Sequence, residues 1–167
     1  MPAGPPRRPT RSKAMYKKIL VPVDGSEENG RAIEEAARMK AVMDARVLLL
    51  HVIDPLWYSH GMERHSVFVN DVLPAMRRHG AEILDAARKR LGQDDASIEV
   101  LLEECEDRRI PDVVVARAQQ WGADLVVMGT RGRRGLDRMF MGSVAEGVAR
   151  TSPVPVLLVR PAPGAGA

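Results

Sequence analysis

The sequence contains one cysteine, Cys105, among its 167 residues, which excludes an internal disulfide. Aromatic residues make up only 4% of the chain, so its core has to be built from aliphatic side chains. No apolar run approaches the roughly 18 residues that a membrane-spanning helix needs, and the N-terminus carries no secretory apolar region. We therefore expect a single soluble, cytoplasmic domain without membrane contact.

The net charge of +3 comes from the N-terminus rather than from the body of the chain. Residues 1–14 are rich in Pro and Arg, contain four basic residues and no acid, and show no apolar periodicity. The rest of the chain carries 21 basic and 22 acidic residues and lacks basic patches with interleaved aromatics, so we expect no nucleic-acid partner. We predict a disordered extension at 1–14, one domain at 15–161 and a disordered tail at 162–167. Met15 directly precedes the first strand, so Met1 and Met15 both stand as candidate start residues.

Five apolar runs alternate with amphipathic segments along the chain. The runs at 18–23, 46–53, 125–128 and 154–159 are typical of strands in a parallel sheet, and the weaker run at 98–102, flanked by acids, is typical of an edge strand. Apolar residues recur at helical spacing within 32–43, 69–91, 111–121 and 143–151, with Ser26 as the N-cap of the first helix. Pro74 either starts the regular part of the second helix or kinks it. This alternation predicts an α/β fold whose parallel sheet is covered by helices on both faces.

Polar and glycine-rich segments follow the first and fourth strands. Asp24 comes directly after the first strand, where its carboxylate could hold ribose hydroxyls or a magnesium ion, or could serve as a turn or capping residue. The fourth strand is followed by Gly129, Gly132 and Gly135 among arginines, and Gly142-Ser143 then opens a helix. A helix N-terminus behind a glycine loop suits a phosphate, although an ordinary basic connection has the same pattern. Because ligands of such sheets lie beyond the carboxyl ends of the strands, we predict an anion site here.

Four segments together resemble the universal stress protein family in its ATP-binding branch. The pattern Gly129-x2-Gly132-x9-Gly142-Ser143 matches the glycine spacing of that branch completely. It is accompanied by Ile-Leu-Val-Pro-Val-Asp-Gly-Ser at 19–26, by His51-Val52 and by Pro-Val-Pro-Val-Leu at 153–157. The resemblance extends over residues 15–160. It implies a Rossmann-like fold, similar to the adenine nucleotide alpha hydrolases, with a five-stranded parallel sheet in the order 3-2-1-4-5.

The resemblance also implies a ligand, a set of contacts and an assembly. ATP is expected over the ends of the first and fourth strands with Mg²⁺ at Asp24, and the backbone of Val52 is expected against adenine. The expected nucleotide-binding residues are Pro22, Val23, Asp24, Val52, Met128, Gly129, Arg131, Gly132, Gly142, Ser143, Val144 and Ala145. A homodimer is expected through the apolar edge strand 154–159, which contains Val154, Val156, Leu157, Leu158 and Val159. The stretch 103–109 departs from the family, which often has a glycine there, and leaves the end of the third strand open.

Three functions are compatible with these residues. The first is a nucleotide-dependent regulator of a stress response that acts as a dimer, with a protein partner that the sequence does not identify. The second is a slow Mg-dependent ATP hydrolase or an adenylyl-transfer enzyme, although the chain has neither the P-loop motif Gly-x4-Gly-Lys-Ser nor a His-x-Gly-His motif. The third is a structural dimeric module with an unused nucleotide site. The intact glycine spacing favours the first.

The histidines and the cysteine suggest no further chemistry. His51, His60, His65 and His79 show no metal-ligand spacing on one element, so we expect no histidine metal site. Cys105 has no adjacent cationic or histidine partner, and we expect a buried or idle thiol rather than a nucleophile.

Overall fold

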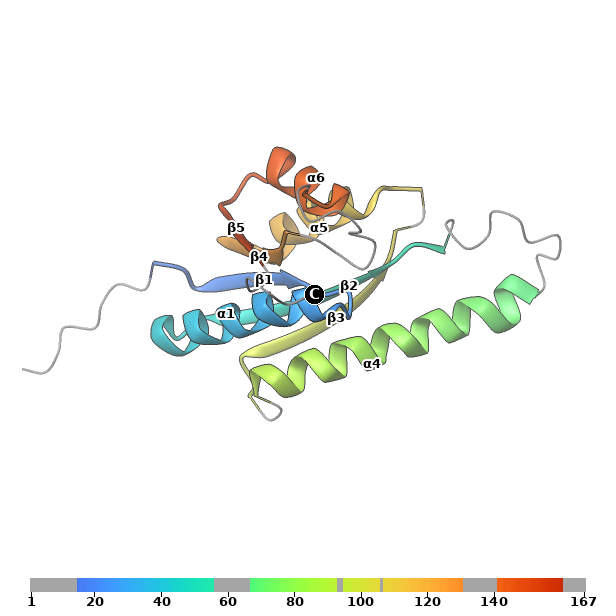
Figure 1. Ribbon diagram of the computed structural model, residues 1–167, viewed down its shortest axis with the longest axis horizontal. Coiled ribbons are helices and arrows are strands. Elements are labelled where there is room, and N and C mark those ends of the chain that lie inside the picture. The colour runs from blue at the N-terminus through green and yellow to red at the C-terminus, as the bar shows by residue number, and fades with distance from the viewer. Residues whose placement is uncertain (1–14, 56–66, 93–94, 106, 131–140, 161–167) are drawn as a thin grey trace, which may run out of the picture.

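The computed structural model describes residues 15–55, 67–92, 95–105, 107–130 and 141–160. The elements in chain order (Figure 1) are β1 (Lys18–Pro22), α1 (Glu27–Met43), β2 (Arg46–Ile53), the π-helix η1 (Phe68–Val72), α4 (Leu73–Leu91), β3 (Ile98–Glu104), α5 (Ile110–Trp121), β4 (Leu125–Gly129), α6 (Ser143–Thr151) and β5 (Val156–Val159). The segments 1–14 and 162–167, which we predict to be disordered, lie outside the described residues.

The strands form one parallel sheet in the order β3-β2-β1-β4-β5. Helices α1 and α4 cover one face of this sheet, and α5 and α6 cover the other (Figure 1). The structure therefore confirms the predicted fold class, the strand order and the position of β3 at an edge.

Two hydrophobic cores fill the space between the sheet and its helices. Successive residues of β1 point to opposite faces, so Ile19 and Val21 lie in the core under α1 and α4, while Leu20 lies in the core under α5 and α6. All three side chains are fully buried, and each contributes about 1.5–3 kcal/mol of hydrophobic stabilisation. The buried members of both cores are aliphatic, as the low aromatic content predicts.

The last strand is shorter than predicted. β5 begins at Val156 rather than at residue 154. Pro153 and Pro155 have no N–H to donate to a ladder, and the N–H of Val154 donates to Ser152 Oγ instead (3.3 Å). The two prolines therefore confine strand pairing to the part of the segment beyond them.

Three other strand ends also differ from the prediction, among them that of β4, which ends at Gly129 rather than at residue 128. β1 ends at Pro22, one residue early, because the chain turns at Asp24. β3 continues to Glu104, two residues beyond the predicted end, and pairs with β2 over that whole length. The stretch 103–109, which differs from the pattern of the family that the sequence resembles, therefore begins inside β3.

The helix starts agree with the capping signals in the sequence. Ser26 is the N-cap of α1, and its Oγ accepts the N–H of Asn29 (3.2 Å). Pro74 is the second residue of α4, directly after the π-helical turn η1, so it starts the regular helix rather than kinking it. Of the helices described, none is both long and apolar enough to cross a membrane.

β1 and β4 lie side by side where the strand order reverses, and their pairing is short. Ile19 pairs with Leu125 and Leu20 with Val126. The chain that leaves β1 enters α1 on one face, whereas the chain that leaves β4 reaches α6 on the opposite face. Open α/β sheets bind ligands in the crevice that such a reversal creates, beyond the carboxyl ends of the strands.

At the opposite, amino end, the carboxylate of Asp124 ties β1 to β4. Its Oδ2 accepts the N–H of Lys17 (2.9 Å), its Oδ1 accepts the N–H of Lys18 (3.1 Å), and its own N–H donates to the Lys18 carbonyl (2.9 Å). On the same side, Lys18 Nζ donates to the Trp121 carbonyl (2.7 Å) and lies 5.0 Å from the centre of the Trp121 ring. These contacts join the strands at the end away from the crevice.

Replacement of Asp124 tests this tie. Asp124→Ala leaves two backbone donors without their acceptor, so we expect the free energy of unfolding to fall by about 1–3 kcal/mol in urea denaturation. Asp124→Asn keeps one carbonyl oxygen at the same place and should lose less. Identical unfolding curves for wild type and Asp124→Ala would show that the carboxylate does not hold the strands.

Candidate functional site

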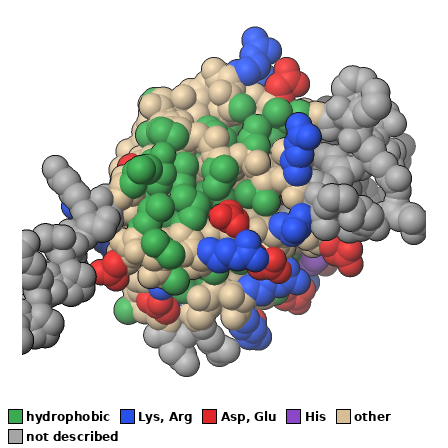
Figure 2. Space-filling model, turned by 60° about the vertical axis from the view of Figure 1, so that its left-hand side comes forward, with side chains coloured by type: hydrophobic (Ala, Val, Ile, Leu, Met, Phe, Trp, Pro, Cys, Tyr) green, Lys and Arg blue, Asp and Glu red, His purple; other side chains and the backbone are tan. Residues whose placement is uncertain are grey.

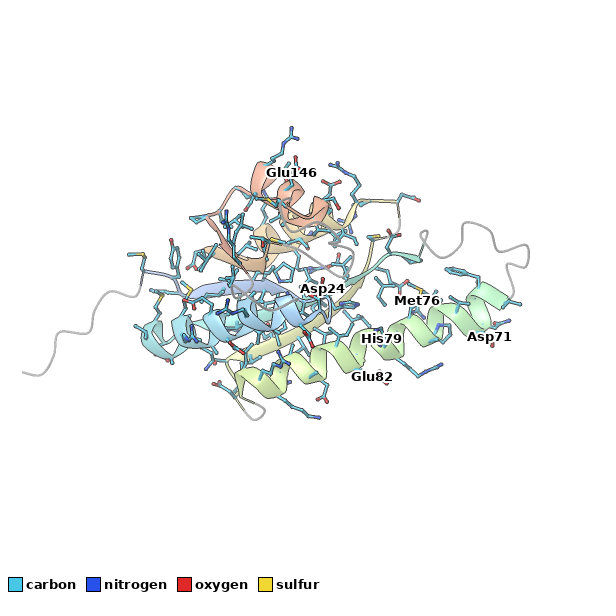
Figure 3. The ribbon with its side chains drawn as sticks, viewed as in Figure 1. Asp24, Asp71, Met76, His79, Glu82 and Glu146 are labelled. Atoms are coloured by element: carbon cyan, nitrogen blue, oxygen red, sulfur yellow. The ribbon has the colours of Figure 1, made fainter. Side chains whose placement is uncertain are left out.

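Asp24 lies in a tight turn at the junction of β1 and α1 (Figure 3). Its Oδ1 accepts two hydrogen bonds from Ser26, one from the N–H (3.0 Å) and one from Oγ (2.7 Å). Gly25 between them has a φ of +78°, and a Cβ there would lie 3.0 Å from the side chain of Ile83 on α4, so glycine is the residue that fits. Of the two roles that the sequence leaves open for Asp24, the turn role is present in the structure.

The start of α6 is held at the end of β4. The N–H of Gly142 donates to the Thr130 carbonyl (2.9 Å), and the N–H of Thr130 donates to the Val159 carbonyl of β5 (3.1 Å). The loop after β4 therefore returns to the strand end from which it departs. Gly142 is the N-cap of α6, and as a glycine it supplies no side-chain acceptor to the N–H groups of the first turn. Such a helix start attracts anions.

The charged pair on α6 and the backbone angles of Gly142 bear on whether this helix start can bind an anion. Glu146 in the first turn pairs with Arg150 (3.7 Å) on the exposed side of the helix, away from Asp24 (Figure 3). Gly142 has φ −64° and ψ 146°, which any residue can adopt. Glycine is thus not required by the backbone at this position, and its advantage at a phosphate site would be the absence of a side chain.

Val52 lies on β2, next to β1 in the sheet. It is half-buried, packs on the core under α5 and α6, and pairs with Glu103 of β3. The N–H of Val23 donates to the Leu50 carbonyl (2.8 Å), so the β2 ladder continues one residue past the end of β1. The backbone of Val52 therefore borders the strand ends where Asp24 and Gly142 also lie.

The structure brings most of the predicted site residues to the carboxyl edge of the sheet. These are Pro22, Val23 and Asp24 after β1, Val52 on β2, Met128 and Gly129 on β4, and Gly142, Ser143, Val144 and Ala145 at the start of α6. The side chains of Met128 and Ala145 are buried in the core, 5% and 3% exposed, so these residues can offer a ligand only their backbone. Arg131 and Gly132 lie outside the described residues.

Sequence reasoning did not assign Asn29 and His51 to this region. Both are buried, and both donate hydrogen bonds to backbone carbonyls at the end of β1. The available signals were a histidine inside the apolar run of β2 and an asparagine in the first turn of α1. Neither pattern predicts which carbonyl the side chain will reach.

The charged residues at the end of β3 and directly after it form ion pairs. Glu103 accepts from Arg117 (2.9 Å) and Arg108 (3.3 Å), and Glu104 accepts from Arg77 on α4 (2.6 Å). The hydrogen bond with Glu104 raises the pKa of Arg77 above its usual value. These pairs neutralise the acids that extend β3 at the sheet edge.

Cys105 is buried, 2% exposed, directly after β3. Burial, together with the neighbouring carboxylate of Asp54, raises the pKa of its thiol to about 11. The structure thus agrees with the prediction of a buried thiol rather than a nucleophile.

No group of three His, Cys, Asp or Glu side chains that could hold a metal ion occurs among the residues that the structure describes. His79 pairs with Glu82 on the same helix (3.6 Å), and both lie on α4 (Figure 3). His60 and His65 lie outside the described residues.

The chain is similar, in sequence and in structure, to proteins of one family. A model of the Universal stress protein family matches residues 15–160. Universal stress protein MJ0531 of Methanocaldococcus jannaschii is 32% identical over 148 residues, which cover 87% of this chain and 83% of that protein. Among solved structures, hypothetical protein MJ0577 of the same organism is similar with a TM-score of 0.77 at 27% identity, over 90% of this chain and 99% of that chain. A universal stress protein from Archaeoglobus fulgidus, solved in complex with dAMP, is similar with a TM-score of 0.63 at 25% identity, over 87% and 98%.

The burial of Cys105 gives a chemical test. At pH 8 a thiol with a pKa near 11 is almost wholly protonated, so we expect iodoacetamide to alkylate the folded protein far more slowly than the urea-unfolded protein. Mass spectrometry of timed aliquots measures both rates. Equal rates in the folded and unfolded protein would mean that the thiol is accessible and ionised.

Proposed function

The chain belongs to the universal stress protein family, and we propose that it is an ATP-binding member, a nucleotide-dependent regulator of a stress response that acts as a homodimer. The observation that carries the proposal is the hydrogen bond from the Gly142 N–H to the Thr130 carbonyl (2.9 Å). This bond fixes the positive end of α6 at the end of β4, next to the strand that leads into Asp24. Phosphates and a ribose would then find donors and acceptors at one edge of the sheet.

The phosphates would be held on the β4 side of the crevice. The backbone N–H groups of Ser143, Val144 and Ala145 lie in the first turn of α6, and Gly142 leaves the approach to them free of a side chain. Gly129, the last residue of β4, would contact the phosphates through its backbone. Arg131 and Gly132, outside the described residues, would complete the phosphate loop.

The base and ribose would lie on the β2 and β1 side. The backbone of Val52 would meet adenine, which allows a preference for the base without a charged side chain. Pro22 and Val23 would line the same side, and Asp24 would meet the ribose hydroxyls.

Mg²⁺ fits this site as an ion that arrives with the nucleotide. Mg²⁺ is usually bound by one or two carboxylates together with phosphate oxygens and water. Asp24 is the carboxylate at the end of β1, and no protein-only cluster of ligands exists among the described residues. Asp24 would therefore supply one ligand, and the bound ion would screen the charge of the phosphates.

The proposal that the ligand is an adenine nucleotide is supported by the Archaeoglobus protein, which was solved in complex with dAMP. That nucleotide has the base and the first phosphate of ATP. The two further phosphates of ATP would need the loop and the start of α6, where the glycine spacing of this chain is intact.

We favour binding and regulation over catalysis because of the state of Asp24. A hydrolase needs a base that orients an attacking water. One oxygen of Asp24 already accepts two hydrogen bonds from Ser26 and is committed to the turn. The proposed function therefore depends on retention of the nucleotide rather than on turnover.

The homodimer would form through β5, whose four residues are all apolar and partly exposed. Hydrophobic side chains gather on the side of the molecule that carries this edge (Figure 2). The opposite edge strand, β3, contains Glu99, Glu103 and Glu104, which discourage strand pairing. Antiparallel pairing of two copies of β5 about a twofold axis would satisfy the open backbone groups and cover the apolar side chains.

Gly142→Val tests the phosphate contacts. Valine can adopt the backbone angles of Gly142, so the fold should survive, but its methyl groups would occupy the approach to the helix N–H groups. We expect ATP affinity to fall at least roughly tenfold in titration calorimetry. Ala149→Val, on the exposed side of the same helix, is the matched control and should bind as wild type does. Unchanged affinity in Gly142→Val would remove the phosphates from this helix start.

Asp24→Asn and Asp24→Ala separate the ligand role of Asp24 from its turn role. Asparagine keeps an oxygen for Ser26 but removes the charge, whereas alanine removes both. We expect affinity for ATP with Mg²⁺ to drop roughly tenfold in both variants and the melting temperature to drop mainly in Asp24→Ala. If Asp24→Asn bound ATP normally, the residue would have the turn role alone.

Leu157→Lys tests the dimer interface. An unpaired ammonium in a buried seam is costly, so this variant should shift toward monomer in sedimentation equilibrium. Val100→Lys is the matched control, because it places the same charge on the other edge strand, at a residue that is 41% exposed. Circular dichroism should show that both variants are folded. A dimer as tight as wild type in Leu157→Lys, or a monomer in Val100→Lys, would place the interface elsewhere.

A further inference from the structure

Two polar side chains, Asn29 on α1 and His51 on β2, are buried among the residues that the structure describes, 5% and 8% exposed. Both donate to backbone carbonyls at the end of β1, and these carbonyls belong to the consecutive residues Pro22 and Val23. Asp24 follows directly. The buried polar side chains thus converge on the backbone that leads into the candidate site.

The contact of His51 defines the state of its ring. Its Nδ1 lies 2.6 Å from the carbonyl oxygen of Val23. A carbonyl oxygen can only accept, so Nδ1 carries the hydrogen, and the neutral ring is the Nδ1–H tautomer. The ring therefore holds the Val23 carbonyl at a fixed distance from β2.

Helix α4 holds that ring in place through Gly80. A Cβ at Gly80 would lie 2.9 Å from His51 Cδ2 and 2.6 Å from Leu102 Cδ1, both too close for a real contact. Glycine allows the backbone of α4 to lie directly against the imidazole. The close contact limits rotation of the ring away from the Val23 carbonyl.

Asn29 holds the neighbouring carbonyl from α1. Its Nδ2 donates to the Pro22 carbonyl (2.9 Å), which fixes the orientation of the amide, because the reverse orientation would place oxygen against oxygen. Its Oδ1 is then buried without a hydrogen-bond partner among the described residues. A buried acceptor without a partner costs free energy that an apolar side chain would avoid. Asparagine at position 29 therefore retains a donor for the Pro22 carbonyl, although its buried Oδ1 lowers the stability of the fold.

The sheet alone does not provide these contacts. β1 pairs with β4 only at Ile19 and Leu20, whereas the strand continues to Pro22. On its β4 side, the last part of β1 therefore lies beyond these two pairs of the ladder, at the carboxyl edge of the sheet. Two side-chain donors hold this part of the backbone in addition to the pairing with β2.

We propose that His51 and Asn29 are positioning residues, which fix the Pro22 and Val23 carbonyls and thereby set the backbone at Asp24 for nucleotide binding. The proposal rests on the proposed function, because it assigns these side chains to the same site. Neither residue touches the nucleotide itself. Their effect on affinity passes through the backbone that they hold.

The test uses paired variants of the full chain. His51→Leu removes the donor, whereas His51→Asn keeps a nitrogen donor near the position of Nδ1. Asn29→Leu removes the second donor. Leu49→Val, on the same strand and in the α1/α4-side core, is the control for loss of packing alone. Each variant is measured by calorimetric titration with ATP and Mg²⁺, by thermal melting and by the ¹³C chemical shifts of the Pro22 and Val23 carbonyls without nucleotide.

We expect ATP affinity to fall roughly five- to tenfold in His51→Leu and in Asn29→Leu, and to stay within about twofold of wild type in His51→Asn and Leu49→Val. The Val23 carbonyl shift should move in His51→Leu and return in His51→Asn. Wild-type affinity in His51→Leu and in Asn29→Leu, or a loss in His51→Asn or Leu49→Val as large as that in His51→Leu, would overturn the positioning role. If wild-type protein bound no ATP, the proposed function would fail, and carbonyl shifts that still followed the donor would show that the contacts order β1 without serving a nucleotide.

Discussion

The pairing between β1 and β4 is short, and it decides where this sheet can receive a ligand. The two strands share only the pairs Ile19–Leu125 and Leu20–Val126, and the chain then leaves them on opposite faces of the sheet. In open α/β sheets such a reversal of the strand order is the place where ligands bind, beyond the carboxyl ends of the strands. The turn at Asp24 borders it from one strand, and the start of α6, fixed by the Gly142–Thr130 hydrogen bond, borders it from the other.

The two ends of these strands are built differently. At the amino end, the carboxylate of Asp124 satisfies two backbone donors, and Lys18 contacts Trp121. At the carboxyl end, the structure contains a positive φ at Gly25, an N-cap residue without a side chain at Gly142, and, on Asn29, a buried acceptor that has no partner among the residues that the structure describes. Local costs of this kind are typical of functional sites, which the remainder of the fold has to support.

Much of the fold could be predicted from the sequence, because buried strands and amphipathic helices leave periodic apolar patterns. The spacing of Gly129, Gly132 and Gly142 is also the sequence feature on which the proposed phosphate contacts are based. Contacts that depend on tertiary approach could not be predicted. The sequence does not reveal that His51 reaches the Val23 carbonyl, that Asp24 is engaged by Ser26, or that Gly142 has ordinary backbone angles. The sequence also indicates that pairing of the last strand is limited to the residues beyond Pro153 and Pro155, which lack the N–H groups of a ladder.

The central claim is that the edge of the sheet at β1 and β4 binds an adenine nucleotide. The most direct measurement is calorimetric titration of wild-type protein, first freed of any co-purified nucleotide, with ATP and in parallel with GTP, both in the presence of Mg²⁺. We expect saturable binding of one ATP per chain and much weaker binding of GTP, because the backbone of Val52 would contact the base. Absence of binding heat with ATP at several temperatures, from protein that is folded and free of nucleotide, would contradict the claim.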